Sequence, residues 1–155
     1  MLNEKDLENF LKEKNVNFEI LKFEENVISS EKAYEKTKGV IVKSILLICD
    51  NSPLLCILLG KDRINLEKIK NIFGCKDVRL AKAKEVREIT EYDIGALPPF
   101  PLKQKIRVIV DEKVEKLKDD EIVFCGGGSH YHLLKISKKD LLKTLENFIV
   151  EKITE

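Results

Sequence analysis

Two apolar segments joined by four turn-forming residues constrain the fold more than any other part of the sequence. Residues 40–49 (VIVKSILLIC) and 54–59 (LLCILL) are almost entirely apolar, and residues 50–53 (DNSP) between them favour a turn. Neither segment approaches the length of about 20 apolar residues that a membrane-spanning helix needs. Apolar segments of this length on either side of a turn predict a hairpin of two well-buried strands.

The remaining segments alternate between helical and strand-like patterns. Helices are expected at residues 7–11, 30–38, 66–73, 82–89 and 141–148, with Ser29, Asn65 and Ser137 as N-terminal caps. Strands are expected at residues 17–23, 78–81, 106–110, 121–125, 131–136 and 149–153. Because strands occur in hairpins as well as after helices, the fold class is α+β (mixed α/β), in one compact domain spanning residues 1–155.

Composition and charge exclude several classes of protein. Of the 155 residues, 43% are hydrophobic and 35% charged, a balance typical of folded domains rather than disordered ones. The net charge of +1 argues against a protein that binds a long stretch of nucleic-acid backbone, but it allows contact with one short RNA end. The N-terminus (MLNEKDLENF) lacks the pattern of a signal peptide, so we expect a cytoplasmic protein without membrane contact. In that compartment all four cysteines are expected to be reduced and structural.

The segment CGGGSHYH, residues 125–132, contains three of the seven glycines and both histidines. Its glycines do not match a nucleotide-phosphate loop, because the segment is followed by a strand pattern rather than a helix. They fit equally well a tight corner between strands or the backbone wall of a ligand site. A catalytic zinc site needs a third protein ligand, and no Cys, Asp or Glu stands at a zinc-site spacing from His130 and His132, which argues against zinc. Either histidine can instead serve as an acid–base group.

Lys43 and a proline-rich loop are the other unusual features. Lys43 is a lone cation within an apolar strand, so it either extends its amine to solvent or binds an anion or a carbonyl oxygen. Residues 90–101 (TEYDIGALPPFP) contain three of the four prolines and follow no period. The apolar content of this loop indicates that it lines a pocket.

Taken in order along the chain, these features resemble the YbaK/prolyl-tRNA-synthetase-associated domain family of aminoacyl-tRNA deacylases. The resemblance rests on VKSILL (42–47), INLEKI (64–69), TEYDIGALPP (90–99), KQKIRVIVD (103–111), the glycines at 126–128 and KDLL (139–142). Glu91 stands where the family usually has glycine. Tyr131-His132-Leu133 stands where the family has glycine-leucine-aspartate.

The resemblance implies a mixed or barrel-like sheet surrounded by helices, and a metal-independent enzyme without cofactors. Its reaction would be hydrolysis of the ester of a mischarged tRNA, of the proline type and charged with cysteine or alanine. The partners would be the 3′ acceptor end of that tRNA and an aminoacyl-tRNA synthetase, with the protein a monomer or a dimer. Lys43 and His132 would be catalytic, and the substrate would be bound by Gly95, Ala96, Leu97, Pro98, Pro99, Gly126, Gly127, Gly128 and Ser129.

Two other classes of function stay open at this point. One is a module that binds a tRNA end or a synthetase without catalysis, and the other is a hydrolase of another small ester or a nucleotide. Within the deacylase class, the nucleophile is either water or the thiol of the substrate itself. The altered loops do not identify the amino acid, because a pocket discriminates one methylene by only about 1–3 kcal/mol.

Overall fold

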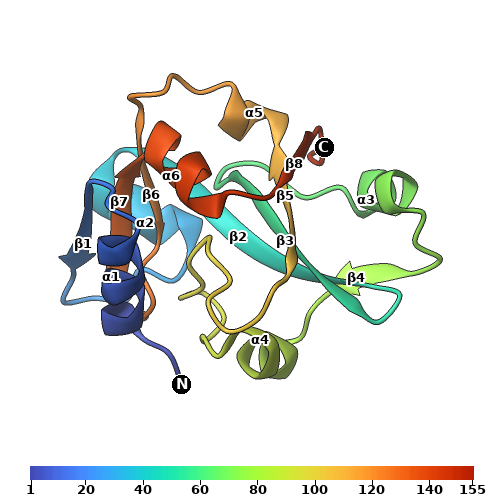
Figure 1. The fold of residues 1–155 in the computed structure, drawn as a ribbon, viewed down its shortest axis with the longest axis horizontal. Helices are drawn as coiled ribbons and strands as arrows, with labels where there is room; N and C mark the ends of the chain where they lie inside the picture. The colour runs from blue at the N-terminus through green and yellow to red at the C-terminus, as the bar shows by residue number, and fades with distance from the viewer.

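Figure 1 shows the computed structural model, which describes every residue from Met1 to Glu155. Its strands are β1 (Phe18–Lys22), β2 (Val40–Cys49), β3 (Ser52–Leu59), β4 (Val78–Leu80), β5 (Arg107–Asp111), β6 (Ile122–Gly126), β7 (His132–Ser137) and β8 (Ile149–Glu151). Its helices are α1 (Glu4–Glu13), α2 (Ser30–Thr37), α3 (Leu66–Phe73), α4 (Ala83–Thr90), α5 (Glu112–Glu115) and α6 (Lys138–Leu145). The strands form one sheet in the order β1-β7-β6-β2-β3-β5-β8, and β4 pairs with β2 beside this path. Parallel and antiparallel pairs both occur, which confirms the predicted α+β class with a mixed sheet.

The predicted hairpin is the centre of this sheet. Strands β2 and β3 pair antiparallel from Val42↔Leu59 to Cys49↔Ser52. The turn is shorter than the sequence suggests, because only Asp50 and Asn51 lie between the strands, both with positive φ (46° and 73°). Two such residues match the twist of a tight hairpin.

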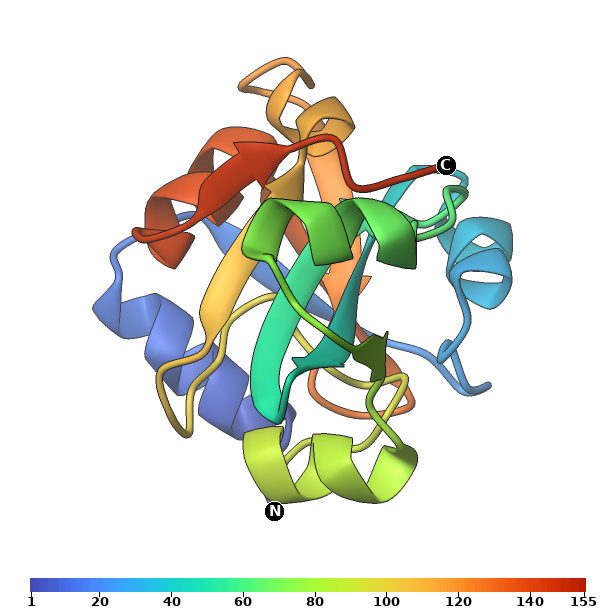
Figure 2. The ribbon, with the colours of Figure 1, turned by 90° about the vertical axis from the view of Figure 1, so that its right-hand side faces the viewer.

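Strand β3 is buried on both faces, which explains its continuous apolar sequence. Successive side chains of a strand point to opposite faces. Leu55, Ile57 and Leu59 belong to the large core cluster, whereas Leu54, Cys56 and Leu58 belong to a second cluster on the other face. Helix α3 covers that second face (Figure 2) and contributes Ile69 to it. None of the six helices has the length and apolarity that crossing a bilayer requires.

The helix starts follow the predicted capping residues. The side chains of Ser29, Asn65 and Ser137 each accept a hydrogen bond from a backbone N–H in the first turn of α2, α3 and α6. Gly74 ends α3 in the left-handed conformation, with φ of 67°. These local signals act within a few residues and therefore can be read from sequence alone.

The prediction that all four cysteines are free thiols is wrong for two of them. Cys49 and Cys75 form a disulfide with their Cα atoms 5.7 Å apart. The reason is the pairing of β4 with the end of β2, which places Val78 opposite Cys49 and brings Cys75, three residues before Val78, beside it. Cys56 and Cys125 are free and buried, and burial raises the pKa of the Cys125 thiol to about 12.

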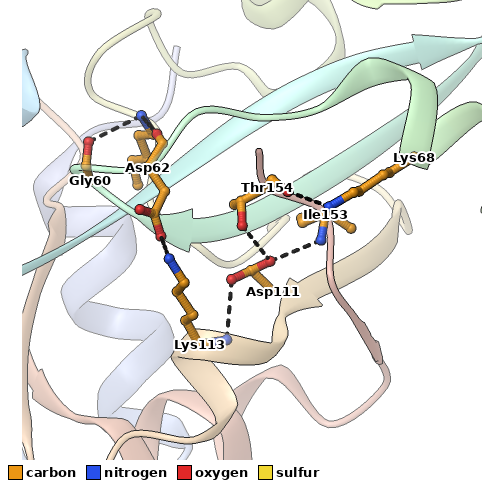
Figure 3. Close-up of polar contacts among 8 residues, drawn as sticks. Gly60, Asp62, Lys68, Asp111, Lys113, Ile153 and Thr154 are labelled. Atoms are coloured by element: carbon orange, nitrogen blue, oxygen red, sulfur yellow. Dashed lines mark hydrogen bonds and ion pairs between the residues drawn. The ribbon is translucent and has the colours of Figure 1, made fainter.

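Asp111, fully buried at the end of β5, holds the C-terminal segment in place (Figure 3). Its Oδ1 accepts hydrogen bonds from the backbone N–H of Ile153 at 2.9 Å and from the Thr154 hydroxyl at 3.4 Å. Its Oδ2 accepts from the backbone N–H of Lys113 at 3.1 Å and so caps α5. A buried carboxylate is stable only with such partners.

We predict that Asp111→Ala destabilises the fold. The substitution leaves buried donors without their acceptor, and the free energy of unfolding should fall by about 3 kcal/mol. Urea denaturation followed by circular dichroism measures this change. Asp120→Ala, at an exposed position, is the matched control and should change the free energy by less than about 0.5 kcal/mol. Equal stability of the two variants would contradict the role of Asp111.

Candidate functional site

A pocket of about 250 Å³ lies where α2, β2, β6 and the loop after α4 meet. Eleven of its seventeen lining residues are hydrophobic. The lining consists of residues 27–30, 33, 41–45, 94, 95, 97, 124–126 and 133. A mostly apolar wall with a few polar groups is the usual composition of a small-molecule site.

A second depression, of about 710 Å³, is larger but contains none of the predicted site residues. It is lined by residues 17–19, 119, 120, 122, 135–137, 139, 140 and 143, which are mainly polar and charged. The smaller pocket is lined by several of the predicted site residues, among them Lys43, Gly95 and Gly126, so it is the candidate site.

Lys43 reaches this pocket from the centre of β2. Its Nζ donates hydrogen bonds to the backbone carbonyls of Gly60 (3.1 Å) and Asp62 (2.6 Å). A lysine ammonium has three N–H donors, so one stays free for a ligand in the pocket. Burial lowers the pKa of Lys43, and the charge of Arg63 lowers it further, whereas the Asp62 carboxylate raises it.

Two glycine-containing loops meet at the opposite wall. The N–H of Gly128 donates to the Ala96 carbonyl at 3.0 Å. At Gly126 a Cβ atom would lie 2.1 Å from the carbonyl oxygen of Leu97, so no other residue fits there without moving the backbone. Gly95 has a φ of 85°, in the region that favours glycine. The contact between these loops gives the pocket its shape.

Backbone N–H groups at this wall differ in their availability. The N–H of Ala96 already donates to the Asp93 carbonyl. Those of Gly95 and Leu97, both in the lining, have no acceptor within the chain. Unpaired N–H groups at a pocket wall can stabilise a negatively charged oxygen.

The start of α2 forms a further part of the wall. Ser29 caps this helix, and Ser29, Ser30 and Ala33 line the pocket. The N-terminal end of a helix carries a partial positive charge. Together with Lys43, it makes one side of an otherwise apolar pocket favourable for an anion or a polarised carbonyl.

Ser44 is a pocket residue that the sequence analysis missed. Its hydroxyl is buried and has no hydrogen-bond partner, although the residue lines the pocket. Buried polar groups are normally paired, so this unpaired hydroxyl is an exception within the pocket lining. The signal in the sequence was a second polar residue beside Lys43 within the apolar strand.

The structure brings together only part of the predicted site. Lys43, Gly95, Leu97 and Gly126 line the pocket. The other predicted residues, Ala96, Pro98, Pro99, Gly127, Gly128, Ser129 and His132, do not line it, and most belong to the two loops behind its wall.

His132 is held by Ser129, whose Oγ lies 2.5 Å from Nδ1 of the imidazole. The next residue, Leu133, lines the pocket, so strand alternation directs His132 to the opposite face of β7. The Nε2 atom of His130 is buried without a partner. No three His, Cys, Asp or Glu side chains lie together in a way that could hold a metal ion.

Two proline–tRNA ligases align with part of the chain. That of Streptococcus mutans serotype c is 30% identical over 96 residues, which are 62% of this chain and 15% of the ligase. That of Streptococcus equi subsp. equi is 33% identical over 97 residues, 63% of this chain and 15% of the ligase. The chain therefore spans about 15% of the length of these relatives.

Solved structures share the whole fold. A candidate trans-editing enzyme for prolyl tRNA synthetase superposes with a TM-score of 0.86 at 23% identity, covering 98% of this chain and 96% of the other. A hypothetical protein superposes with a TM-score of 0.84 at 26% identity, covering 96% and 99%. The sequence profile of the aminoacyl-tRNA editing domain matches residues 24–144, more than half of the chain, and the chain therefore belongs to that family.

Proposed function

We propose that this chain is a trans-editing aminoacyl-tRNA deacylase. It hydrolyses the ester between a wrongly attached amino acid, cysteine or alanine, and the 3′-terminal ribose of a proline-type tRNA. One observation carries the proposal: in a member of the editing family, a half-buried lysine, the Gly95–Leu97 loop and Gly126 at the end of β6 line a single small pocket. The proposed reaction needs neither a metal ion nor a cofactor.

The similar proteins support the choice of tRNA. The aligned ligases act on proline and tRNA, and the structural neighbour is a candidate trans-editing enzyme for prolyl tRNA synthetase. Because the fold matches that neighbour over 98% of this chain and 96% of the other, we propose that the chain likewise acts in trans, on tRNA released by or held on a synthetase.

The pocket offers the groups that this reaction requires. An aminoacyl ester is labile, so an enzyme need mainly position the carbonyl and stabilise the oxyanion formed on attack. The free N–H of Lys43 and the unpaired backbone N–H groups of Gly95 and Leu97 are the proposed donors to that oxyanion. The backbone groups are held by the contact between the loops and need little rearrangement.

The size of the pocket favours a small aminoacyl group. At about 250 Å³ it lies below the range of about 300–1,000 Å³ that is usual for drug-sized ligands. A small amino acid and the adjoining ribose fit this volume better than a whole nucleotide does. The near-neutral net charge of +1 agrees with contact to the end of a tRNA rather than to a long duplex.

The nucleophile in this proposal is water or the thiol of a cysteinyl substrate. A catalytic role for His132, as the group that orients the water, stays a prediction. Ser129 fixes the ring of His132, which suits such a role, but the ring lies outside the pocket lining.

A panel of substrates tests the function. Purified protein is incubated with tRNA-Pro charged with alanine, cysteine, serine or proline, and with free nucleotides, and release of the amino acid is followed over time. We expect release from at least one mischarged tRNA and none from the prolyl form. Hydrolysis of nucleotides alone, or no hydrolysis with tight tRNA binding, would contradict the proposal and favour one of the two other classes.

We predict that Lys43→Ala abolishes deacylation while the protein stays folded. The loss of a pre-positioned cationic donor should lower kcat by about 100- to 1,000-fold. Single-turnover deacylation measures the effect, and thermal unfolding checks the fold. Lys105→Ala, at an exposed position, serves as the control. Undiminished hydrolysis in Lys43→Ala would remove this lysine from the mechanism.

We predict that Gly126→Ala damages both stability and activity. The added Cβ meets a backbone carbonyl, so the two loops must separate, at a cost of about 1–3 kcal/mol in unfolding free energy. Deacylation should fall by about tenfold or more. At Gly74 a Cβ meets nothing within 4 Å, although φ is 67°. Gly74→Ala should therefore lose about 1 kcal/mol of stability but no activity. Equal activity losses in both variants would argue against a specific role for the loop contact.

The predicted role of His132 has its own test. A water-orienting histidine contributes about 100-fold or more to kcat, so His132→Ala should lose that factor at unchanged stability. His130→Ala is the matched control, since it removes the neighbouring imidazole. An alanyl substrate is used, because it has no thiol of its own. Wild-type kcat in His132→Ala would exclude His132 from the reaction.

A further inference from the structure

The loop at residues 60–63 is the part of the molecule that holds the amine of Lys43. Both protein acceptors of that amine are backbone carbonyls of this loop, those of Gly60 and Asp62. The loop is tied to the hairpin by hydrogen bonds from the Gly60 N–H to Ile41 and from the Asp62 N–H to Leu59. The position of the amine in the pocket therefore depends on where this short loop lies.

Asp62 joins this loop to a distant part of the chain (Figure 3). While its carbonyl accepts from Lys43, its Oδ2 lies 3.3 Å from Nζ of Lys113. The Asp62 side chain is only 14% exposed, whereas that of Lys113 is 47% exposed. Lys113 is the charged partner of this carboxylate, and its half-exposed amine leaves the pair partly screened by solvent.

Lys113 is itself placed by the buried anchor at Asp111. The Asp111 carboxylate caps α5 through the Lys113 N–H and binds Ile153 and Thr154 of the C-terminal segment. A chain of contacts therefore runs from the core anchor through the Lys113–Asp62 ion pair to the carbonyls that hold the amine of Lys43.

We propose that Asp62 is a positioning residue for Lys43 and that it acts together with Lys113. The ion pair fixes the 60–63 loop, and the loop carbonyls hold the Lys43 amine at the pocket by hydrogen bonds. This inference rests on the proposed function for its kinetic readout, but the contact with Lys43 is independent of any reaction.

Electrostatics gives the proposal a second consequence. Burial lowers the pKa of Lys43, Arg63 lowers it as well, and the Asp62 carboxylate is the group that raises it. Asp62→Asn removes that last effect, so the pKa of Lys43 falls further. If the protonated amine is needed, the basic limb of the kcat profile then moves to lower pH.

Three variants test the proposal: Asp62→Asn, Lys113→Met and Lys113→Arg. We expect Asp62→Asn and Lys113→Met to lower kcat by about tenfold or more with little change in KM, because a small displacement of a catalytic group is costly. Lys113→Arg should restore most of kcat by restoring the ion pair. Lys116→Met, at the C-terminal cap of the same short helix and paired only with Glu112 at 3.8 Å, is the control and should keep full activity.

Global stability separates positioning from a merely structural role. A half-exposed ion pair contributes little to unfolding free energy, so Lys113→Met should keep nearly the wild-type midpoint in urea. A loss of kcat that follows a loss of stability, with no rescue by Lys113→Arg, would overturn the proposal. Wild-type kcat and an unmoved basic limb in Asp62→Asn would also overturn it.

A second readout is independent of catalysis. Competitive acetylation followed by mass spectrometry reports the reactivity of the Lys43 amine across pH, and in Asp62→Asn its titration should move to lower pH. If the wild-type protein releases no amino acid but this shift occurs, the deacylase function fails and the coupling of Asp62 to Lys43 stands. An unchanged titration of Lys43 overturns the coupling, whatever the activity.

Discussion

Strand β2, at the centre of the sheet, is the element on which the candidate site is built. It pairs with β3 along one edge and with β6 and β4 along the other, so it cannot move without disrupting the whole sheet. It contributes Lys43 to the pocket lining, and its hairpin partner β3 leads directly into the loop that holds the amine. Burial of β3 on both faces fixes this hairpin, and the geometry of the site follows from it.

A cation in such a strand is costly unless its surroundings compensate for the lost water. Here two backbone carbonyls, a nearby carboxylate and the open side of the pocket provide that compensation for Lys43. The loop after α4 adds further donors, since the N–H groups of Gly95 and Leu97, both in the lining, have no acceptor within the chain. An apolar pocket with donors on two sides is suited to an ester whose carbonyl becomes an oxyanion.

The sequence predicts what depends on near neighbours. The hairpin and the caps at Asn65 and Ser137 could be inferred from residues close together in the chain, and the family from the order of short motifs along it. The Cys49–Cys75 disulfide could not be inferred, because it depends on the pairing of β4 with β2. For the candidate site, the sequence predicted Lys43, His132 and residues of two loops, of which Lys43, Gly95, Leu97 and Gly126 line the pocket. It did not reveal which loop residues line the pocket, because that depends on how closely two distant backbones approach.

The most direct test of the account is a crystal structure with a stable aminoacyl-adenosine amide, which mimics the charged 3′ end of a tRNA. The account predicts that the acyl group occupies the pocket between β2 and the Gly95–Leu97 loop. Its carbonyl oxygen should lie about 3 Å from the Lys43 amine and from a backbone N–H of that loop. Binding in the larger depression over β1 and β7, or binding in the pocket without contact to Lys43, would contradict the central claim.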